Sequence, residues 1–410
     1  MKRNNSIYIS PQNDVLIKVI TFMISPFLSF LYSLRTMNTR SSYVVFFLFA
    51  IFFGMAFTVS GELEGMQYYI DGVFYRMDFE NYCFSNKNLF IRDWNEYIGL
   101  KGDIKDFYFN VVAFGVSRIS NNYHLMFMVI AMVFAYFQLK SLAFFTKEKN
   151  YQNCIFTLVL ALIFCWNQIF NINGARYNTA AWVFVYCVFQ LFLNNNKKYF
   201  FLLVLTPFIH AAFFVYSAFL VIAYWLKGKS RFWKVAFIVS FFVSSLSTVL
   251  MRYVQAFLPD VLAVFVDNYT IGAGNAENSL VNTSSMSGFL MSISSIYANF
   301  LMLWLVLKYR NNTDEKTNRI YSAFLILATF MNFFMPISSL GGRMVLMVYP
   351  LMAFVWLRYF GINYKYNWLI YLFPMIFYIT LRTKLQQYQM VTSSSFWFSN
   401  PFKIISQYLL

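Results

Sequence analysis

The feature of this sequence that most limits its fold is a series of long apolar runs. A transmembrane helix needs roughly 17–25 apolar residues, and runs of that kind recur along the 410-residue chain. Hydrophobic residues make up 60% of the sequence and charged residues 12%, against about 25% charged in an ordinary soluble domain. The 52 Phe and 30 Tyr suit helices that face lipid and place aromatic rings at both interfaces. We therefore expect an all-α, polytopic membrane protein.

The apolar runs predict ten to twelve transmembrane helices. The ten individual candidates are Val15–Leu34, Tyr43–Val59, Tyr123–Leu139, Cys154–Phe170, Tyr177–Leu193, Val235–Met251, Gly288–Leu307, Ile320–Met335, Ser339–Leu357 and Tyr366–Leu381. The first run carries Lys18 and Pro26, so a helix lying along the inner surface is the alternative there. A further segment, Tyr199–Leu226, is too long for one ordinary span and too short for two.

The positions of the basic loops indicate on which face of the membrane the segment Tyr199–Leu226 begins and ends. Short basic loops favour the cytoplasm, and all six basic loops fall on one side only if this segment enters and leaves by the same face. Pro207 interrupts a helix here, because proline lacks an amide hydrogen and clashes with the preceding turn. We therefore predict a re-entrant hairpin with His210 near its tip. Broken backbone at that depth is tolerated only in protein or beside a wet cavity, so His210 should lie at a cavity.

Two long polar segments, Ser60–Asn122 and Arg252–Ser287, then form outer loops, with the chain after Leu381 on the same side. They hold twelve of the sixteen acidic residues, which agrees with a cytoplasmic side marked by basic loops. Within the first loop, Phe107–Ile119 is expected to be a helix on the outer surface. The sequence shows no internal repeat or linker, so we expect residues 1–410 to form one integral membrane domain.

Several classes of function are disfavoured. The net charge of +16 comes from Lys and Arg residues that punctuate apolar runs instead of forming one patch, so nucleic-acid binding is not expected. The four cysteines show neither metal-ligand nor disulfide-framework spacing. The sequence has no phosphate-cradling loop, metal cluster or serine nucleophile motif. We expect neither a metal nor a cofactor.

Two arginines are predicted near the outer ends of membrane helices. Arg176 ends the outer turn at residues 171–176, and Arg343 follows two glycines. Each joins a guanidinium group to a helix N-terminus, whose N–H groups and partial positive charge favour anions. Because the planar fork of arginine binds phosphate oxygens in pairs, the two arginines predict a diphosphate site. Alternatively, each extends to the interface or pairs with a loop carboxylate.

Other polar residues are candidates for catalysis and sugar binding. His210, one of two histidines, suits a general base or a hydrogen-bond partner of a phosphate, or a core histidine that satisfies broken backbone. Asp71 and Tyr75 lie in an outer-loop stretch that mixes aromatic, carboxylate and amide groups. Such a mixture suits sugars, although a solvated loop would show the same residues. Weaker sugar-binding candidates in the second outer loop are Asp267, Tyr269 and Glu277.

Taken in order along the chain, these residues resemble the EpsG/Wzy group of polysaccharide polymerases. The matching features are an outer-loop Asp71 and Tyr75, the run Arg176-Tyr177-Asn178-Thr179-Ala180 opening a span, Phe208-Ile209-His210 at a helix break, and a late Gly342-Arg343. The similarity covers most of the chain between Asp71 and Arg343. In similar proteins a glutamine commonly follows the first arginine, whereas Tyr177 stands here.

The resemblance implies a glycosyltransferase that joins oligosaccharide repeat units carried on undecaprenyl diphosphate, at the outer face of the bacterial cytoplasmic membrane. Its expected partners are this lipid-linked oligosaccharide, membrane lipid and a chain-length regulator. We expect Arg176 and Arg343 to stabilise the diphosphate leaving group without a metal, with His210 as first and Asp71 as second candidate for the base. An O-antigen ligase and a flippase are the alternatives, although the low charge within the spans favours an enzyme.

Overall fold

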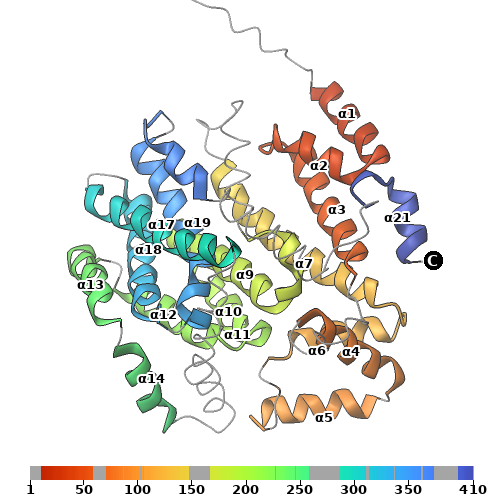
Figure 1. Ribbon diagram of the computed structural model, residues 1–410, viewed down its shortest axis with the longest axis horizontal. Coiled ribbons are helices and arrows are strands. Elements are labelled where there is room, and N and C mark those ends of the chain that lie inside the picture. The colour runs from red at the N-terminus through yellow and green to blue at the C-terminus, as the bar shows by residue number, and fades with distance from the viewer. Residues whose placement is uncertain are drawn as a thin grey trace, which may run out of the picture.

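A computed structural model describes residues 11–58, 71–85, 87–101, 104, 106–146, 167–226, 228–244, 246–257, 286–310, 314–336, 338–361, 363–373 and 396–409. Over these residues the chain forms helices and turns and no β-strand (Figure 1). The helices are α1 (Pro11–Ile24), α2 (Pro26–Leu34), α3 (Arg40–Ala56), α4 (Asp71–Phe84), α5 (Lys87–Ile98), α6 (Tyr108–Ser117), α7 (Tyr123–Thr146), α9 (Ala175–Phe192), α10 (Tyr199–Val204), α11 (Thr206–Ile209), α12 (Phe213–Trp225), α13 (Ser230–Val243), α14 (Leu246–Gln255), α17 (Met286–Lys308), α18 (Glu315–Phe333), α19 (Arg343–Phe360) and α21 (Pro401–Tyr408). Three short segments are η3 (Ile169–Gly174), η6 (Ser338–Gly342) and η7 (Phe396–Phe398). The predicted all-α class is confirmed for this part of the chain.

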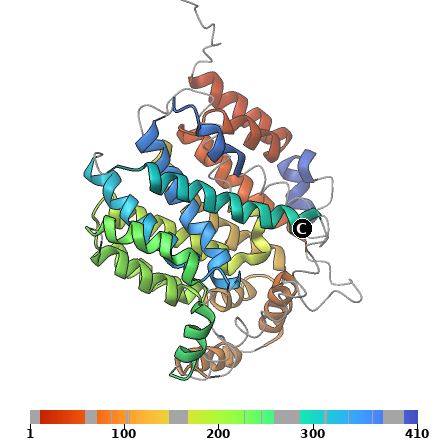
Figure 2. The same cartoon turned by 60° about the vertical axis from the view of Figure 1, so that its left-hand side comes forward.

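Helices α9, α18 and α19 pack against one another at the centre of the bundle (Figure 2). Sixteen of the eighteen residues of α9 are buried, as expected of a helix that is apolar all round. Two fully buried tryptophans still satisfy their indole N–H groups. Trp182 donates to the backbone oxygen of Asn167 at 2.9 Å, and Trp356 donates to the amide oxygen of Asn367 at 2.9 Å. These bonds fix the central helices to their neighbours.

Two helices in the described part of the chain are long and apolar enough to cross a bilayer, Tyr123–Thr146 and Leu340–Phe360, of 24 and 21 residues. The first of them packs closely against α3. A Cβ on Gly54 would lie only 2.5 Å from the Cβ of Ala131 and 2.7 Å from a backbone oxygen. Small residues allow this close approach of two helices, as is common in membrane proteins.

The segment predicted as a hairpin consists of α10, α11 and α12, and it folds back on itself. Its arms lie side by side, because Thr206 and Ser217 hydroxyls are 3.0 Å apart and the Phe200 and Tyr224 rings are 4.9 Å apart. The helical backbone ends at His210, which is extended. Pro207 lies in the first turn of α11, where proline is tolerated. The break predicted near Pro207 and His210 is confirmed, and it falls at the histidine.

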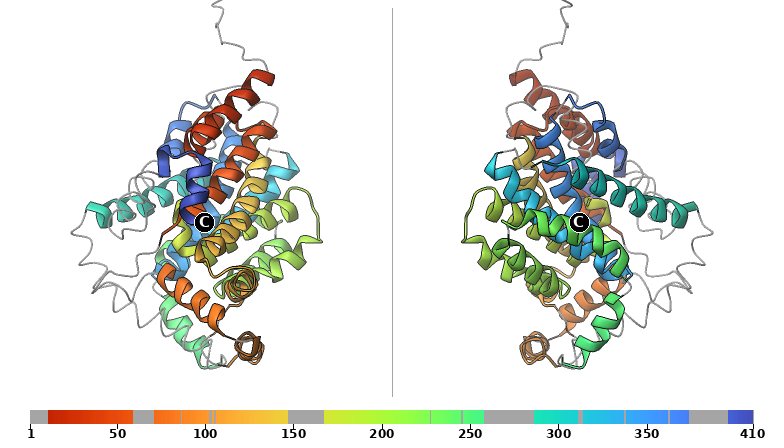
Figure 3. Two further views of the ribbon diagram at one scale, coloured as in Figure 1. Left: turned by 90° about the vertical axis from the view of Figure 1, so that its right-hand side faces the viewer. Right: turned by 90° about the vertical axis from the view of Figure 1, so that its left-hand side faces the viewer.

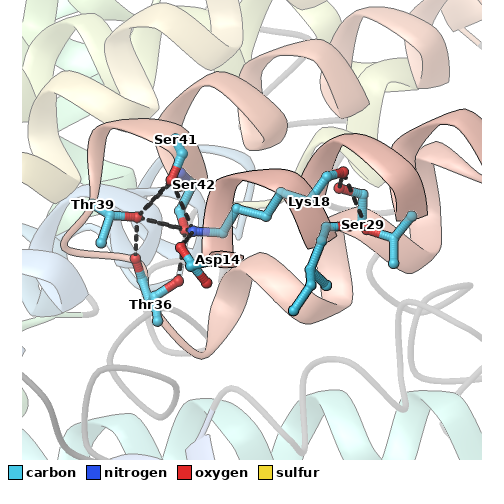
Figure 4. A network of polar contacts seen from close by, with 9 residues as sticks. Asp14, Lys18, Ser29, Thr36, Thr39, Ser41 and Ser42 are labelled. Atoms are coloured by element: carbon cyan, nitrogen blue, oxygen red, sulfur yellow. Dashed lines mark hydrogen bonds and ion pairs between the residues drawn. The ribbon is translucent and has the colours of Figure 1, made fainter. Parts of the chain in front are cut away.

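The first apolar run is not one helix, so the predicted span Val15–Leu34 is wrong as a single element. Ser25 caps α2 and Pro26 starts it, after α1 has ended. At 14 and 9 residues, the helices rise only about 21 and 14 Å. Lys18, 1% exposed, joins α1 to the start of α3: its Nζ donates to Asp14, to Thr39 at 3.1 Å and to Ser41 at 2.9 Å (Figure 4).

The predicted span Val235–Met251 is also wrong as a single helix. The chain divides it into α13, which packs on α18, and α14. Helix α13 ends just before Ser244, which is the first of two consecutive serines in the sequence. Small polar residues of this kind are common where helices bend sharply. Several large side chains of α14 are exposed, among them Leu246, Val249 and Tyr253.

Helices α4, α5 and α6 form a layer at the end of the molecule opposite α1 and α2, and α14 lies at the same end (Figures 1 and 3). We call α4–α6 the polar layer. The helix predicted within Phe107–Ile119 is confirmed as α6. Near this layer the C-terminal helix α21 is fixed by Asn122, whose amide donates to the backbone oxygen of Tyr408 at 2.6 Å.

The remaining predicted helices differ in how much of them is described. Those at Tyr43–Val59, Tyr123–Leu139, Tyr177–Leu193, Gly288–Leu307, Ile320–Met335 and Ser339–Leu357 correspond to α3, α7, α9, α17, α18 and α19. Most of Cys154–Phe170 and half of Tyr366–Leu381 lie outside the described residues. Helix α17 crosses the central helices instead of running alongside them (Figure 2).

Candidate functional site

The first turn of α9 is held by contacts from both sides. Before it, η3 brings the chain round to Ala175, and a Cβ on Gly174 would lie 2.7 Å from the amide nitrogen of Asn178. A larger residue there would have to displace the Asn178 amide group. The Asn173 side chain accepts a hydrogen bond from the backbone N–H of Gly72 at 2.8 Å. The turn that carries Arg176 is therefore attached directly to the beginning of α4.

Arg176 is bound to two side chains of the polar layer and its approach. Its Nη1 donates to Oδ1 of Asp106 at 3.0 Å, and its Nε donates to the hydroxyl of Tyr75 at 3.0 Å. The Asp106 side chain is 4% exposed and that of Arg176 is 34% exposed. The alternative that this arginine pairs with a loop carboxylate is thus what the structure shows, and the side chain stays partly exposed.

Tyr75 contributes to this arrangement from inside the polar layer. The side chain is 3% exposed, and its ring lies 4.6 Å from that of Phe109. Burial raises the pKa of Tyr75 to about 12, so the hydroxyl stays protonated at neutral pH and accepts from the Arg176 Nε. The structure therefore gives Tyr75 a part in holding Arg176. Sugar binding by Tyr75 stays a prediction.

Arg343 has different surroundings from Arg176. It begins α19 directly after η6, where a Cβ on Gly341 would lie 2.4 Å from the backbone of Phe334. The hydroxyl of Tyr216 donates to the backbone oxygen of Leu340 at 2.9 Å and fixes the same segment. The guanidinium carbon of Arg343 lies 5.3 Å from the centre of the Tyr177 ring. Arg343 is exposed and forms no ion pair with any described carboxylate.

His210 also lies against the Tyr177 ring. Their ring centroids are 5.1 Å apart, with the rings perpendicular, so the Tyr177 ring contacts both His210 and Arg343. Both Arg176 and Arg343 are close enough for their charges to act on His210. The Nδ1 of His210 accepts from the backbone N–H of Ala212 at 3.2 Å. The neutral ring then carries its proton on Nε2 and donates, which favours hydrogen bonding to a phosphate over proton abstraction through Nε2.

The other predicted site residues are placed only in part. Asp71 is exposed and is the first residue of α4, next to the bond between Gly72 and Asn173. Asp267, Tyr269 and Glu277 lie outside the described residues. The residue that sequence reasoning missed is Asp106, which is separated from Arg176 by 70 positions. In the sequence, Asp106 was recognisable only as one of the acidic residues of the first outer loop.

The fold and the site together define a class: a helical membrane protein in which two arginines and a histidine lie together beside a layer of polar helices. The chain belongs to the EpsG family, whose family model matches residues 65–396. This family consists of polysaccharide polymerase-like membrane proteins. The resemblance found between Asp71 and Arg343 is thereby confirmed. No curated protein and no solved structure matches the chain.

Proposed function

We propose that this protein polymerises polysaccharide by transferring lipid-diphosphate-linked oligosaccharide repeat units onto one another at the outer face of the bacterial cytoplasmic membrane. The observation that carries the proposal is that His210 and Arg343 both contact the ring of Tyr177, the residue next to Arg176, and that Arg343 has no carboxylate partner in the described part of the chain. A cation left unpaired at a helix N-terminus suits an anionic ligand. Membership of the EpsG family supports the polymerase class.

In the proposed reaction the sugar of the donor is transferred from its lipid diphosphate to a hydroxyl oxygen of the acceptor. The bond between the anomeric carbon and the diphosphate oxygen breaks, and a bond to the acceptor oxygen forms. Arg343 and Arg176 stabilise the negative charge that develops on the diphosphate, and the Nε2–H of His210 donates to it. Asp71, an exposed carboxylate beside the Arg176 turn, takes the proton of the acceptor hydroxyl.

The proposed membrane arrangement follows from the same contacts. In this proposal the chain enters at Tyr199 and leaves at Leu226 on one side, and the contacts between the α10 and α12 arms support it. The break at His210 then lies at the depth of Tyr177, near the outer end of α9. In this arrangement the polar layer faces the outside, and the basic loops face the cytoplasm. The site opens to the side on which lipid-linked repeat units are joined.

Deletion of the gene, followed by gel analysis of surface polysaccharide, tests the proposed function. We expect single repeat units in place of long chains, restored to long chains by the wild-type gene. Polymer that accumulates unattached on its lipid would instead indicate a ligase. Repeat units that fail to reach the outer face would indicate a flippase. Either result would overturn the proposed polymerase activity.

A further inference from the structure

Asp106 is the one described carboxylate that pairs with either site arginine. It is nearly inaccessible to solvent and accepts from Nη1 of Arg176, while Tyr75 accepts from Nε. The remaining nitrogen of the fork, Nη2, has no partner among the described residues. Two of the three guanidinium nitrogens are therefore fixed by protein, and the third is left for a ligand.

The residue that follows Asp106 makes a second connection. The backbone N–H of Phe107 donates to the backbone oxygen of Phe208 at 3.0 Å, and their rings are 6.1 Å apart. Phe208 lies two residues before His210 at the end of α11. Asp106 and Phe107, which directly precede α6, thus bind the first turn of α9 and the hairpin next to its break, respectively. They set how Arg176 and His210 lie relative to each other.

We propose that Asp106 is a positioning residue that orients the free edge of Arg176 toward the lipid diphosphate and leaves Arg343 as the principal cation for binding it. This inference rests on the proposed function. A carboxylate fixes the planar fork of an arginine in one orientation and offsets part of its charge. Positioning affects turnover more than binding, because misplacement by about 1 Å can cost about a hundredfold in rate.

The test compares Asp106→Asn with wild-type protein, purified and supplied with lipid-linked repeat units. Asparagine keeps the size and one acceptor oxygen but removes the charge, so we expect kcat to fall about tenfold to a hundredfold, with KM for the donor nearly unchanged. Asp106→Glu, which keeps the carboxylate, should recover part of kcat. It also provides a second variant if the asparagine protein is poorly folded. Wild-type kcat in Asp106→Asn would overturn the proposal.

Asp93→Asn is the matched control. Asp93 is another buried carboxylate of the polar layer, paired with Arg92 at 3.1 Å and bonded to Tyr82, without contact to Arg176. We expect its loss to lower Tm but to leave kcat per folded molecule at the wild-type level. An equal loss of kcat in both variants would show that any weakening of the layer has this effect, and would overturn a specific role for Asp106.

A double-mutant cycle separates positioning from general damage. If Asp106 acts through Arg176, Asp106→Asn should add little to the loss already caused by Arg176→Lys, because coupled residues are non-additive. Fully additive losses would contradict the proposal. An inactive wild-type protein with correctly folded variants would instead count against the proposed function itself, so the two failures are distinguishable.

Discussion

At the scale of single residues, the two arginines of the site have different electrostatic surroundings. Arg176 is already paired with Asp106, whereas Arg343 lies over the Tyr177 ring and has no carboxylate partner among the described residues. A charge that is already paired attracts a further anion less than an unpaired one. We therefore expect Arg343 to contribute mainly to binding of the donor and Arg176 mainly to its orientation.

Lysine at each position tests this division. Both Arg343→Lys and Arg176→Lys should impair polymerisation while leaving membrane insertion intact, because lysine keeps the charge and loses the fork. Hydrogen bonds to charged groups are worth about 1.5–3 kcal/mol, so we expect about tenfold to a hundredfold effects. The KM should rise in the first variant and kcat should fall in the second. Near-normal polymer from both would contradict a diphosphate site.

The role of His210 can be tested by glutamine. Glutamine keeps an N–H donor but cannot take up a proton near neutral pH, and a general base contributes about 10²–10⁴-fold. If His210 donates through Nε2, His210→Gln should stay within about tenfold of wild-type kcat while His210→Phe is much slower. A loss of at least about a hundredfold in both would mean that His210 is the base. His124→Gln, at the start of α7, provides the control.

At the scale of elements, breaks in helices decide what the apolar runs become. A break near His210 was predictable from Pro207 and from the basic loops on either side of the segment, although Pro207 itself lies in the first turn of α11 and the helix ends at His210. The division of the first run followed from Ser25 and Pro26, yet overall hydropathy treats that run as continuous. The pairing of Arg176 with Asp106 had no local pattern to predict it, since only the tertiary fold brings the segment before α6 to the first turn of α9.

The contact between α3 and α7 gives a prediction about stability. Gly54→Ala should destabilise the protein by about 1–3 kcal/mol, because the new Cβ would overlap Ala131 and a backbone oxygen. Gly115→Ala in α6 has no atom within 4 Å of its Cβ, so helix propensity should make it neutral or stabilising, by up to about 1 kcal/mol. Thermal unfolding in detergent measures both. Equal effects would contradict the described packing of α3.

For the molecule as a whole, the proposed site forms only if the polar layer and the hairpin tip lie on the same, outer side of the membrane. The all-α class was predictable from the length of the apolar runs, but which face each helix buries is decided by packing that hydropathy does not contain. A cysteine beside Lys227, in a cysteine-free background, should resist a membrane-impermeant thiol reagent applied from outside. One beside Glu277 should react. Labelling beside Lys227 from outside would invert every later loop and remove Arg343 from the outer site.

Polymerisation by the purified protein, in lipid vesicles supplied with lipid-linked repeat units, tests whether Arg343 binds the diphosphate of the donor. We predict a ladder of products from wild-type protein and almost none from Arg343→Gln. Arg358→Gln is the matched control, because Arg358 lies at the other end of α19 and pairs with Asp314 at 2.9 Å; this variant should keep the ladder. Single repeat units alone from folded wild-type protein, or equal ladders from both variants, would contradict the account.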